Sequence, residues 1–455
     1  MKTVEKTKDK KLPVIGITTL GCPKNLVDTE NLIGILHAAG YPITADQEKA
    51  DLCLVNTCTF IEGSTNESVD VLTELAEDGK KLIVAGCMAQ RFKGDIFDEL
   101  PEAQAVLGTG NVAQILDVVK EVTKNLNEGI DSKIVAVDDV PMAVANAQTP
   151  RMNTQVGPSA YLKIAEGCDH RCAFCIIPHL RGDMKSRTIE DIVEEAKILV
   201  KNGAKELVLV SQDSTAYGTD IYKKRALADL LKAVADESGA QWIRVMYAYP
   251  TELDEEMLEI MSSRENIRNY IDIPLQHASA KVLKSMRRPG TVKDTVALIK
   301  EKLPEACIRT TLITGFPGET DEDFNELYDF VKESRFDRVG VFTYSPESGT
   351  PAGDFEDQVE EEVKHDRRNK IMELQQQISL EKNQEFIGKE IDMLIEHIEL
   401  ATGRVVGRSF RDAPEIDGQL YFTVKDLQDA PDPGEIIKVR VTDCDAYDLF
   451  VEFTS

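Results

Sequence analysis

A repeated order of short apolar runs and helix-period segments is the feature that most constrains how this sequence folds. Residues 12–130 contain four candidate strands, VIGITTL, LCLVNT, KLIVAG and AVLGTG, and helix-period segments such as 26–39 and 66–77 lie between them. Strands that alternate with helical crossovers pair in parallel, because a parallel connection needs a long return path. We therefore expect an open parallel α/β sheet in this first part of the chain.

The same order returns six times in residues 154–360. The strand candidates are YLKIAEG, ELVLVSQ, IRVMYAY, IRNYIDIP, IRTTLITG and RVGVFTY. Eight such units would close a full barrel, so six of them predict a partial (βα)6 barrel. The fourth unit is the weakest, because its expected helix over residues 279–287 is short and basic.

A polar helix is expected over residues 361–385, and the hydrophobic period then changes to two. Ile437, Val439 and Val441 alternate with polar residues, and glycines divide the segment into short runs. This pattern predicts a small antiparallel β-barrel at the end of the chain. The expected domains are an α/β domain (12–130), a linker (131–153), a partial barrel (154–385) and a β-barrel (386–455).

The charge of the chain limits its partners. It has 53 Lys and Arg against 80 Asp and Glu, which gives a net charge of −27. Such a surface repels nucleic-acid phosphates and anionic lipid, so we expect no direct nucleic-acid binding. No apolar run is long enough to cross a bilayer, and the charged amino-terminal residues do not resemble a secretion signal. We therefore expect a cytoplasmic protein without a membrane partner, in which the nine cysteines are thiols or metal ligands rather than disulfides.

Three cysteines lie in one short loop directly after the first strand of the second block. Cys168, Cys172 and Cys175 have the spacing C-x3-C-x2-C. Three thiolates do not complete the tetrahedral site of a zinc ion, but they can hold three irons of a [4Fe–4S] cube and leave the fourth iron open. An open iron can accept a chelating ligand such as S-adenosylmethionine (SAM). The alternative is a zinc site with a distant fourth ligand, for which His170 and His179 are the candidates.

Three other cysteines are far apart in the sequence but share one structural position. Cys22, Cys58 and Cys87 each lie just past the carboxyl end of a candidate parallel strand. Ligands of open α/β sheets gather outside these strand ends, so three loops could bring the sulfurs to a second cluster. The alternative is that they are ordinary buried cysteines. Cys53, which lies inside its strand, is expected to be a packing residue.

The sequence around the cysteines resembles a known family. The C-x3-C-x2-C loop is similar to that of the radical SAM superfamily. GCPKNLVDTE, VNTCTFI and AGCMAQR resemble the amino-terminal domain of methylthiotransferases, whereas SQDSTAYG, IPLQHAS, LKSMRRPGT, TGFPGET and YSPESGTPA resemble their catalytic domain. The expected terminal barrel resembles their TRAM domain. The resemblance covers the chain from residue 12 onward.

Two branches of this family act on different polymers. One modifies an adenosine derivative in tRNA, and the RimO-type branch modifies the β-carbon of an aspartate in small-subunit ribosomal protein uS12. GCPKN, AEGCDHRCAFCIIP and VFTYSPESGTPA resemble the RimO-type branch. Residues 386–455 hold 7 Lys and Arg against 15 Asp and Glu, a net charge of −8, which disfavours RNA and favours a basic ribosomal protein. The alternative is that this acidity serves only solubility.

The resemblance implies an enzyme with two [4Fe–4S] clusters and SAM, which serves as radical source and as methyl donor. The cluster on the C-x3-C-x2-C loop would cleave SAM to a radical that takes a hydrogen from the aspartate β-carbon. The cluster on the three distant cysteines would present the sulfur, and both would face one cavity. A flavodoxin or ferredoxin would supply electrons, and no catalytic residue beyond the cluster ligands is expected.

Strand ends of the partial barrel are also expected to hold SAM. The candidates are Phe174, Ser211, Gln212, Gln276 and Gly315. Phe174 would offer its backbone to the adenine, and Gly315 lies in a turn that allows close approach of the backbone. The alternative is that these are ordinary loop and turn residues.

Two other functions are compatible with the sequence. One is a tRNA adenosine methylthiotransferase that uses the same chemistry. The other is a non-catalytic iron–sulfur electron carrier or scaffold. The six βα units argue against a carrier, because electron transfer alone needs no barrel.

Overall fold

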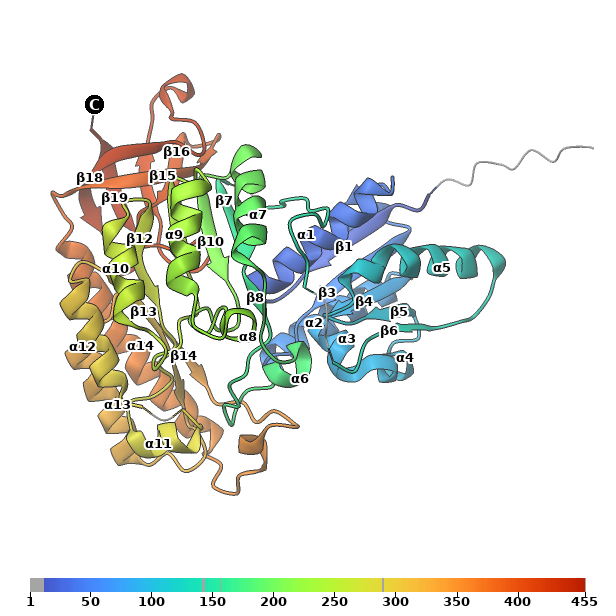
Figure 1. Cartoon of the computed structure of the whole chain (residues 1–455), viewed down its shortest axis with the longest axis horizontal. Helices are drawn as coiled ribbons and strands as arrows, with labels where there is room; N and C mark the ends of the chain where they lie inside the picture. Colours follow the sequence, from blue (N-terminus) through green and yellow to red (C-terminus); the bar gives the residue numbers. More distant parts are fainter. Residues whose placement is uncertain (1–11, 141–143, 156, 289, 455) are drawn as a thin grey trace, which may run out of the picture. The chain divides into compact units, whose positions relative to one another are not determined.

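The computed structural model of the protein describes residues 12–140, 144–155, 157–288 and 290–454. They form two compact units (Figure 1). Unit 1 contains the described residues up to Asn153 and His179–Gly182, and unit 2 contains Thr154–Pro178 and the residues from Asp183 onward. Among the described residues, no helix has the length and apolar character needed to span a bilayer.

Unit 1 is built on a six-stranded parallel sheet in the order β2-β1-β3-β4-β5-β6. Its main elements are β1 (Ile15–Thr19), α1 (Pro23–Ala38), β2 (Ile43–Thr44), β3 (Leu52–Thr57), α2 (Glu62–Glu77), β4 (Leu82–Gly86), α3 (Cys87–Phe92), α4 (Ile96–Glu99), β5 (Ala103–Leu107), α5 (Ile115–Glu128) and β6 (Ile134–Ala136). The four apolar runs form β1, β3, β4 and β5. These strands belong to one parallel sheet, which confirms the predicted open parallel α/β sheet.

Alternate residues of the central strands of unit 1 pack into two separate cores. In β3, Leu54 belongs to the core formed with α1 and α5, whereas Cys53 and Val55 belong to the core formed with α2 and α3. Helices therefore cover both faces of the sheet, and every residue of β3 is buried, as is typical of central parallel strands. Cys53 occupies a packing position inside its strand.

The segment expected to be a linker contributes to unit 1. Its residues Ile134–Ala136 form β6, which pairs in parallel with β5. Farther along, Arg151 and Glu30 of α1 form a buried ion pair at 2.6 Å. Residues 141–143 of this segment lie outside the described residues. A strand of three residues is too short to produce a detectable hydrophobic period, which explains why the sequence pattern did not predict β6.

Unit 2 contains a second six-stranded parallel sheet, in the order β14-β13-β12-β11-β10-β7. Its elements up to the terminal barrel are β7 (Ser159–Lys163), β8 (Ala165–Glu166), β9 (Lys185–Ser186), α7 (Ile189–Lys201), β10 (Glu206–Val210), α8 (Thr219–Tyr222), α9 (Leu227–Glu237), β11 (Trp242–Val245), α10 (Glu255–Ser263), β12 (Ile267–Asp272), α11 (Ala280–Ser285), α12 (Val292–Lys302), β13 (Cys307–Thr314), α13 (Asp321–Ser334), β14 (Arg338–Thr343) and α14 (Glu361–Gln384). Helix α6 (Ile177–Arg181) begins in unit 2 and ends in unit 1.

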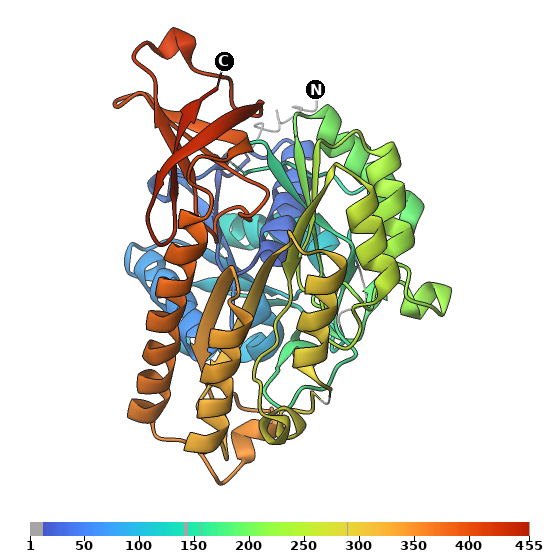
Figure 2. The ribbon, with the colours of Figure 1, turned by 90° about the vertical axis from the view of Figure 1, so that its left-hand side faces the viewer.

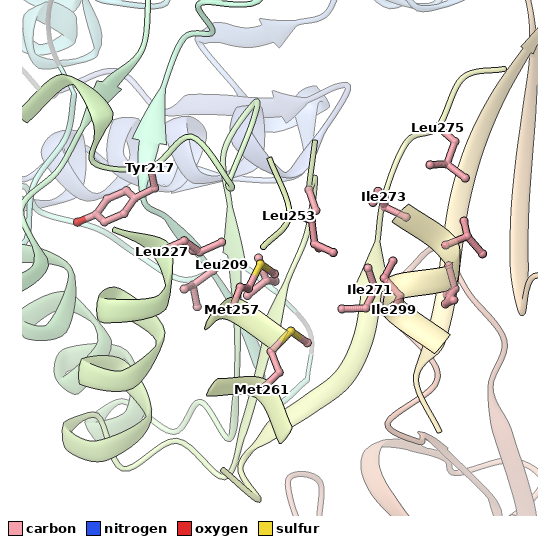
Figure 3. Packing of buried hydrophobic residues seen from close by; sticks show 14 of the residues in the cluster. Leu209, Tyr217, Leu227, Leu253, Met257, Met261, Ile271, Ile273, Leu275 and Ile299 are labelled. Atoms are coloured by element: carbon pink, nitrogen blue, oxygen red, sulfur yellow. The ribbon is translucent and has the colours of Figure 1, made fainter. Parts of the chain in front are cut away.

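The strands of this sheet follow one another in space in the order of the sequence. Every crossover therefore moves the chain by one strand in the same direction, as in a (βα)8 barrel, and the prediction of an open, six-unit barrel is confirmed. The large core lies between the strands and the helices that cover them, where Leu209 of β10 lies near Leu227 of α9 and Met257 of α10 (Figure 3).

The fourth βα unit differs from the expectation in one respect. Helix α11 is as short as predicted, but a second helix, α12, completes the crossover. Val292, Val296 and Ile299 lie on its buried side, at the spacing of a helix that packs on a sheet. The prediction for this unit stopped one helix too early.

Helix α14 packs along β14 and β13 and leads into a closed five-stranded barrel (Figure 2). The strands of the barrel are β15 (Glu390–Glu399), β16 (Arg404–Arg408), β17 (Leu420–Thr423), β18 (Ile436–Cys444) and β19 (Leu449–Phe453). The barrel confirms the prediction, although the closing pair of β17 and β19 is parallel. An odd number of strands cannot alternate in direction all the way round, so one neighbouring pair must be parallel.

The loop between β16 and β17, residues 409–419, attaches the barrel to the parallel sheet of unit 2. Arg244 of β11 donates to the carbonyl of Phe410 at 2.9 Å, and the Tyr270 hydroxyl of β12 donates to Asp417 at 2.6 Å. Arg338 donates to Asp412 at 2.7 Å. Arg338 begins β14, whereas Arg244 and Tyr270 lie within β11 and β12, so this loop is held by three strands of the sheet.

A buried ion triad strengthens this joint. Glu206, at the start of β10, accepts hydrogen bonds from Arg408 at 2.7 Å and from Arg244 at 3.0 Å. Burial alone would raise the pKa of the Glu206 carboxyl, but the two guanidinium groups hold it at about 2. A carboxylate flanked by two cations remains charged inside the protein, because its attraction to the cations offsets the cost of its burial.

Candidate functional site

The structure brings Cys22, Cys58 and Cys87 together in unit 1. Cys22 is the residue before α1, Cys58 follows β3, and Cys87 begins α3 directly after β4. The thiols of Cys22 and Cys58 both lie near enough to Cys87 to act on its pKa. The parallel register of β1, β3 and β4 places the three loops at one edge of the sheet, as strand-end position suggested.

Gly21 allows these loops to approach each other. Its φ is +91°, and a Cβ atom at this position would lie 2.8 Å from the Cβ of Cys58. Only glycine combines a left-handed backbone with so little space. The turn before Cys22 therefore depends on a residue without a side chain.

A buried polar frame surrounds these three thiols. The amide of Asn25 donates to the carbonyls of Leu20 and Thr57, at 2.9 and 3.0 Å, so its own oxygen points in a fixed direction. That oxygen accepts a hydrogen bond from the guanidinium of Arg181, which also donates to the Cys87 sulfur at 3.7 Å. The sequence reasoning did not identify Arg181, because its partners lie far away in the chain.

The electrostatic environments of the three thiols differ. Burial raises the pKa of Cys87 to about 12, and Arg181 opposes this rise only in part. Burial also raises the pKa of Cys58. At Cys22, burial raises the pKa, but Lys24, Arg181 and two backbone N–H groups together lower it by more. The pKa of Cys22 therefore falls below its ordinary value.

Cys168, Cys172 and Cys175 lie together in unit 2, in the loop that follows β8. The backbone N–H of Cys175 donates to the carbonyl of Cys172 at 3.1 Å, which closes a tight turn. Ala173 in this turn bonds to the carbonyl of Met286 at 2.9 Å. Burial raises the pKa values of Cys168 and Cys175 to about 12. The loop is thus compact and anchored to the segment after α11.

A layer of side chains lies against this second trio. Arg288 donates to the Cys172 sulfur at 3.6 Å and lies over the ring of Tyr249 at 4.1 Å. His170 stacks on Tyr249 with 3.7 Å between ring centroids and bonds to Asp213 at 2.7 Å. Asp213 and Tyr249 follow β10 and β11, so their strand-end positions were the signal that could have identified them.

A zinc site would need ligands close enough together to bind one ion. Within the described ranges, no three His, Cys, Asp or Glu side chains lie close enough to hold one metal ion. In a [4Fe–4S] cube each cysteine binds a different iron, so the sulfurs stand farther apart than the ligands of one ion. Of the two histidines named for a zinc site, His170 bonds to Asp213 at 2.7 Å, and His179 lies in α6, four residues after Cys175.

Ser211 and Gln212 follow the carboxyl end of β10, where the sequence analysis placed candidate SAM ligands. The buried Ser211 hydroxyl lies 3.1 Å from that of Ser214. The amide nitrogen of Gln212 donates to Glu166 at 2.7 Å. The amide oxygen of Gln212 is buried and has no hydrogen-bond partner among the described residues. A bound molecule with a donor group would satisfy it.

The other three candidates are held mainly by the fold. Phe174 packs against the core of unit 2. Gln276, after β12, has φ +69° and its backbone pairs with β13. Gly315, after β13, has φ +72°, and a Cβ there would lie 2.1 Å from the Cγ of Lys364 in α14. Helix α14 therefore requires glycine at position 315 regardless of any ligand.

Three parts of the chain match known family models. Residues 14–108 match the uncharacterized protein family UPF0004, residues 162–331 match the radical SAM superfamily, and residues 387–453 match the TRAM domain. The match to the TRAM domain falls on the terminal five-stranded barrel. The order of the three matches is the order that the resemblance implied.

Curated relatives cover almost the entire chain. Ribosomal protein uS12 methylthiotransferase RimO of Microcystis aeruginosa is 47% identical over 97% of this chain and 99% of its own. The protein of the same name from Acaryochloris marina is 46% identical over 96% of this chain and 98% of its own.

A solved structure shares the fold. The radical SAM methyltransferase TsrM of Kitasatospora setae, with cobalamin and a [4Fe–4S] cluster bound, superimposes with a TM-score of 0.54 at 15% identity, over 75% of this chain and 77% of its own. The identity to the curated relatives confirms the RimO-type resemblance of the sequence: the chain belongs to the RimO family of ribosomal protein uS12 methylthiotransferases, within the radical SAM superfamily.

Proposed function

We propose that this protein inserts a methylthio group at the β-carbon of an aspartate in ribosomal protein uS12. The family name supports the substrate and the reaction. The observation that carries the proposal is the grouping of six cysteines in two trios, each beside the carboxyl ends of parallel strands. An electron carrier would need neither the second trio nor the partial barrel. The ribosomal substrate places the proposed reaction in the cytoplasm.

The radical SAM domain implies an iron–sulfur cluster and SAM. We propose two [4Fe–4S] clusters, one on each trio. Each trio offers three thiolates and leaves one iron without a protein ligand. When bound, the clusters and SAM supply the electron, the radical, the sulfur and the methyl group of the reaction. A one-electron donor such as flavodoxin or ferredoxin would reduce the enzyme.

The residues of the second trio's site have separate tasks in this proposal. Cys168, Cys172 and Cys175 bind three irons, and Arg288 holds the Cys172 sulfur in place. The unpaired amide oxygen of Gln212 accepts a hydrogen bond from SAM at the carboxyl end of β10. Phe174, Ser211, Gln276 and Gly315 complete the proposed SAM contacts, Ser211 through its hydroxyl.

The site in unit 2 is partly closed to water. Cys172 is buried, whereas Cys168 and Cys175 are partly exposed, and the rings of His170 and Tyr249 stack on each other beside Arg288. Exclusion of water protects a reactive radical from side reactions. The chain itself therefore binds, orients and shields, while the bound groups perform the bond-breaking steps.

The terminal barrel offers a surface of suitable charge for a basic protein. Its exposed residues include acids and aromatics on β18, on β19 and in the turn between them: Asp443, Asp445, Tyr447, Phe450, Glu452 and Phe453. Two of the barrel's seven cations, Arg408 and Arg411, are buried in the joint with the parallel sheet. The carboxyl groups of Asp412 and Asp417 are buried there as well, so the exposed barrel keeps the net acidity of its sequence, which favours uS12 and disfavours tRNA.

Mass spectrometry of both polymers tests this proposal. The anaerobically reconstituted, reduced protein is incubated with SAM and a sulfide source, once with purified uS12 and once with tRNA that lacks the modification. We expect uS12 to gain a mass equal to one sulfur and one methylene, with formation of 5′-deoxyadenosine. A gain on tRNA instead would overturn the substrate, and no 5′-deoxyadenosine with either polymer would favour a carrier.

A further inference from the structure

One buried cation serves the trio in unit 1 but comes from the segment that carries the other trio. Arg181 lies six residues after Cys175 in the sequence, yet its side chain belongs to unit 1. It is only 1% exposed. Its guanidinium donates to the Cys87 sulfur at 3.7 Å and to Asp28 of α1 at 3.1 Å.

The frame around Arg181 fixes the direction of its charge. Asp28 holds one nitrogen of the guanidinium, and Asn25 accepts from the other. The nitrogen that bonds to Asn25 is also the one that faces the Cys87 sulfur. Asn25 cannot turn away without losing its two bonds to backbone carbonyls. The cation is therefore held at the sulfur rather than placed near it by chance.

The same cation is buried beside the loops that carry the trio. It donates to the Cys87 sulfur and to Asn25, whose amide donates to the backbone carbonyls of Leu20 and Thr57, close to Cys22 and Cys58 in the sequence. Three thiolates give a bound cluster negative charge, and reduction adds another negative charge. In a buried site a fixed cation interacts more strongly with such charge than it would in water.

We propose that Arg181 is a positioning residue that stabilises the reduced, more negative state of the cluster at Cys22, Cys58 and Cys87, and so raises its reduction potential. This inference rests on the proposed function, because it needs a cluster at that trio. Hydrogen bonds to cysteine sulfurs and nearby charge are the means by which proteins tune such potentials.

The competing explanation is a purely structural ion pair. Unit 1 contains another such pair, in which Arg151 bonds to Glu30 of the same helix, α1, at 2.6 Å, with both side chains buried. The Arg151–Glu30 pair is therefore a matched control. If Arg181 only fastens its own segment to α1, neutral replacement of either pair should affect stability and leave the potential of the cluster unchanged.

The experiment uses the full chain in which Cys168, Cys172 and Cys175 are all replaced by Ala, so that one cluster remains visible. Potentiometric titration followed by electron paramagnetic resonance gives its midpoint potential. The variants are Arg181→Lys, Asp28→Asn, the neutral pair Arg181→Gln with Asp28→Asn, and the control pair Arg151→Gln with Glu30→Gln.

We expect the neutral pair at 181 and 28 to disfavour reduction at least tenfold, which is about 59 mV for a one-electron couple. Arg181→Lys should shift the midpoint in the same direction by less, because it keeps the charge and loses the fixed hydrogen bonds. Asp28→Asn should shift it the opposite way, because the cation is then less neutralised. The control pair should leave the midpoint in place.

The outcomes separate this inference from the proposed function. No iron or sulfide in the background chain would show that the trio in unit 1 binds no cluster, and the proposed function would fail. A cluster whose midpoint is the same in the control pair and in all the 181 and 28 variants would leave the proposed function intact and overturn the role of Arg181. If the neutral pair does not fold, the opposite shifts of Arg181→Lys and Asp28→Asn still decide the question.

Discussion

The two cysteine trios are assembled by opposite routes. Cys168, Cys172 and Cys175 come from one loop, whose tight turn is closed by local hydrogen bonds. Cys22, Cys58 and Cys87 come from three loops, and only the register of the parallel strands β1, β3 and β4 unites them. The first arrangement is local and the second belongs to the whole sheet.

The two sites nevertheless share one electrostatic device. A guanidinium nitrogen lies 3.7 Å from Cys87 in unit 1 and 3.6 Å from Cys172 in unit 2. The surroundings of these cations differ. Arg181 is fixed by Asp28 and Asn25, whereas Arg288 lies over an aromatic ring. Cysteine spacing and local electrostatics are therefore independent features of such a site.

Loss of a thiol from the local trio should abolish the entire reaction. In Cys172→Ala the loop retains only two thiols, too few to hold the cluster that cleaves SAM. We expect no 5′-deoxyadenosine above background by chromatography and no mass gain on uS12. Normal SAM cleavage by this variant would contradict the assignment of Cys172.

Loss of a thiol from the distributed trio should divide the reaction. We expect Cys58→Ala to keep SAM cleavage within about threefold and to lose thiomethylation of uS12 completely, because Cys58 serves only the site in unit 1. The mass of uS12 and the yield of 5′-deoxyadenosine, measured in one sample, check this. Cys53→Ala is the control and should keep both activities, since Cys53 packs inside β3.

Acid should weaken the joint that supports the site in unit 2. The pKa of Glu206 is about 2 in the folded protein against 4.5 ordinarily. This depression contributes about 3 kcal/mol of stability above pH 4.5. The contribution is lost as the pH falls from about 4.5 toward 2, because the unfolded chain takes up the proton first.

The single tryptophan, Trp242, begins β11 and is buried, so its fluorescence reports on the sheet next to this joint. Denaturant titrations at several pH values should show the loss of stability in the wild type. Glu206→Gln cannot titrate and should show a smaller loss over the same pH range. Equal losses in both proteins would assign the acid sensitivity to other groups.

A methyl group at Gly21 should damage only the distributed trio. Gly21→Ala forces an alanine into φ +91° and places its Cβ 2.8 Å from that of Cys58. We expect a loss of about 2 kcal/mol in unfolding free energy and a reduced iron content, with SAM cleavage retained. Gly63→Ala in α2 is the matched control: nothing lies within 4 Å of its added Cβ.

The smallest effect is expected at Arg288. Arg288→Gln removes the cation from the Cys172 sulfur while all three thiols remain, so the rate of SAM cleavage should fall about tenfold, as for other groups that support a metal ligand. The electron paramagnetic resonance signal of the reduced cluster should also change. Arg287→Gln, at the exposed neighbouring position, should leave both rate and signal unchanged.

The apolar periodicity carried most information about the fold. It predicted both parallel sheets and the terminal barrel, because alternation and helical spacing follow directly from strand and helix geometry. It missed β6 and α12, one a strand of three residues and the other a second helix in one crossover. The sequence also placed Ser211, Gln212, Gln276 and Gly315 at strand ends, and their part in SAM binding stays a prediction.

The sequence by itself determined the order of strands and helices, the local C-x3-C-x2-C loop and the strand-end positions of the other three cysteines. The tertiary structure alone decided which charged groups meet these sulfurs and which ones join the terminal barrel to the sheet in unit 2. Arg181 and Cys87 are 94 residues apart, and Arg408 and Glu206 are 202 residues apart. Such pairs leave no periodic trace in the sequence, because each partner is placed by a different part of the fold.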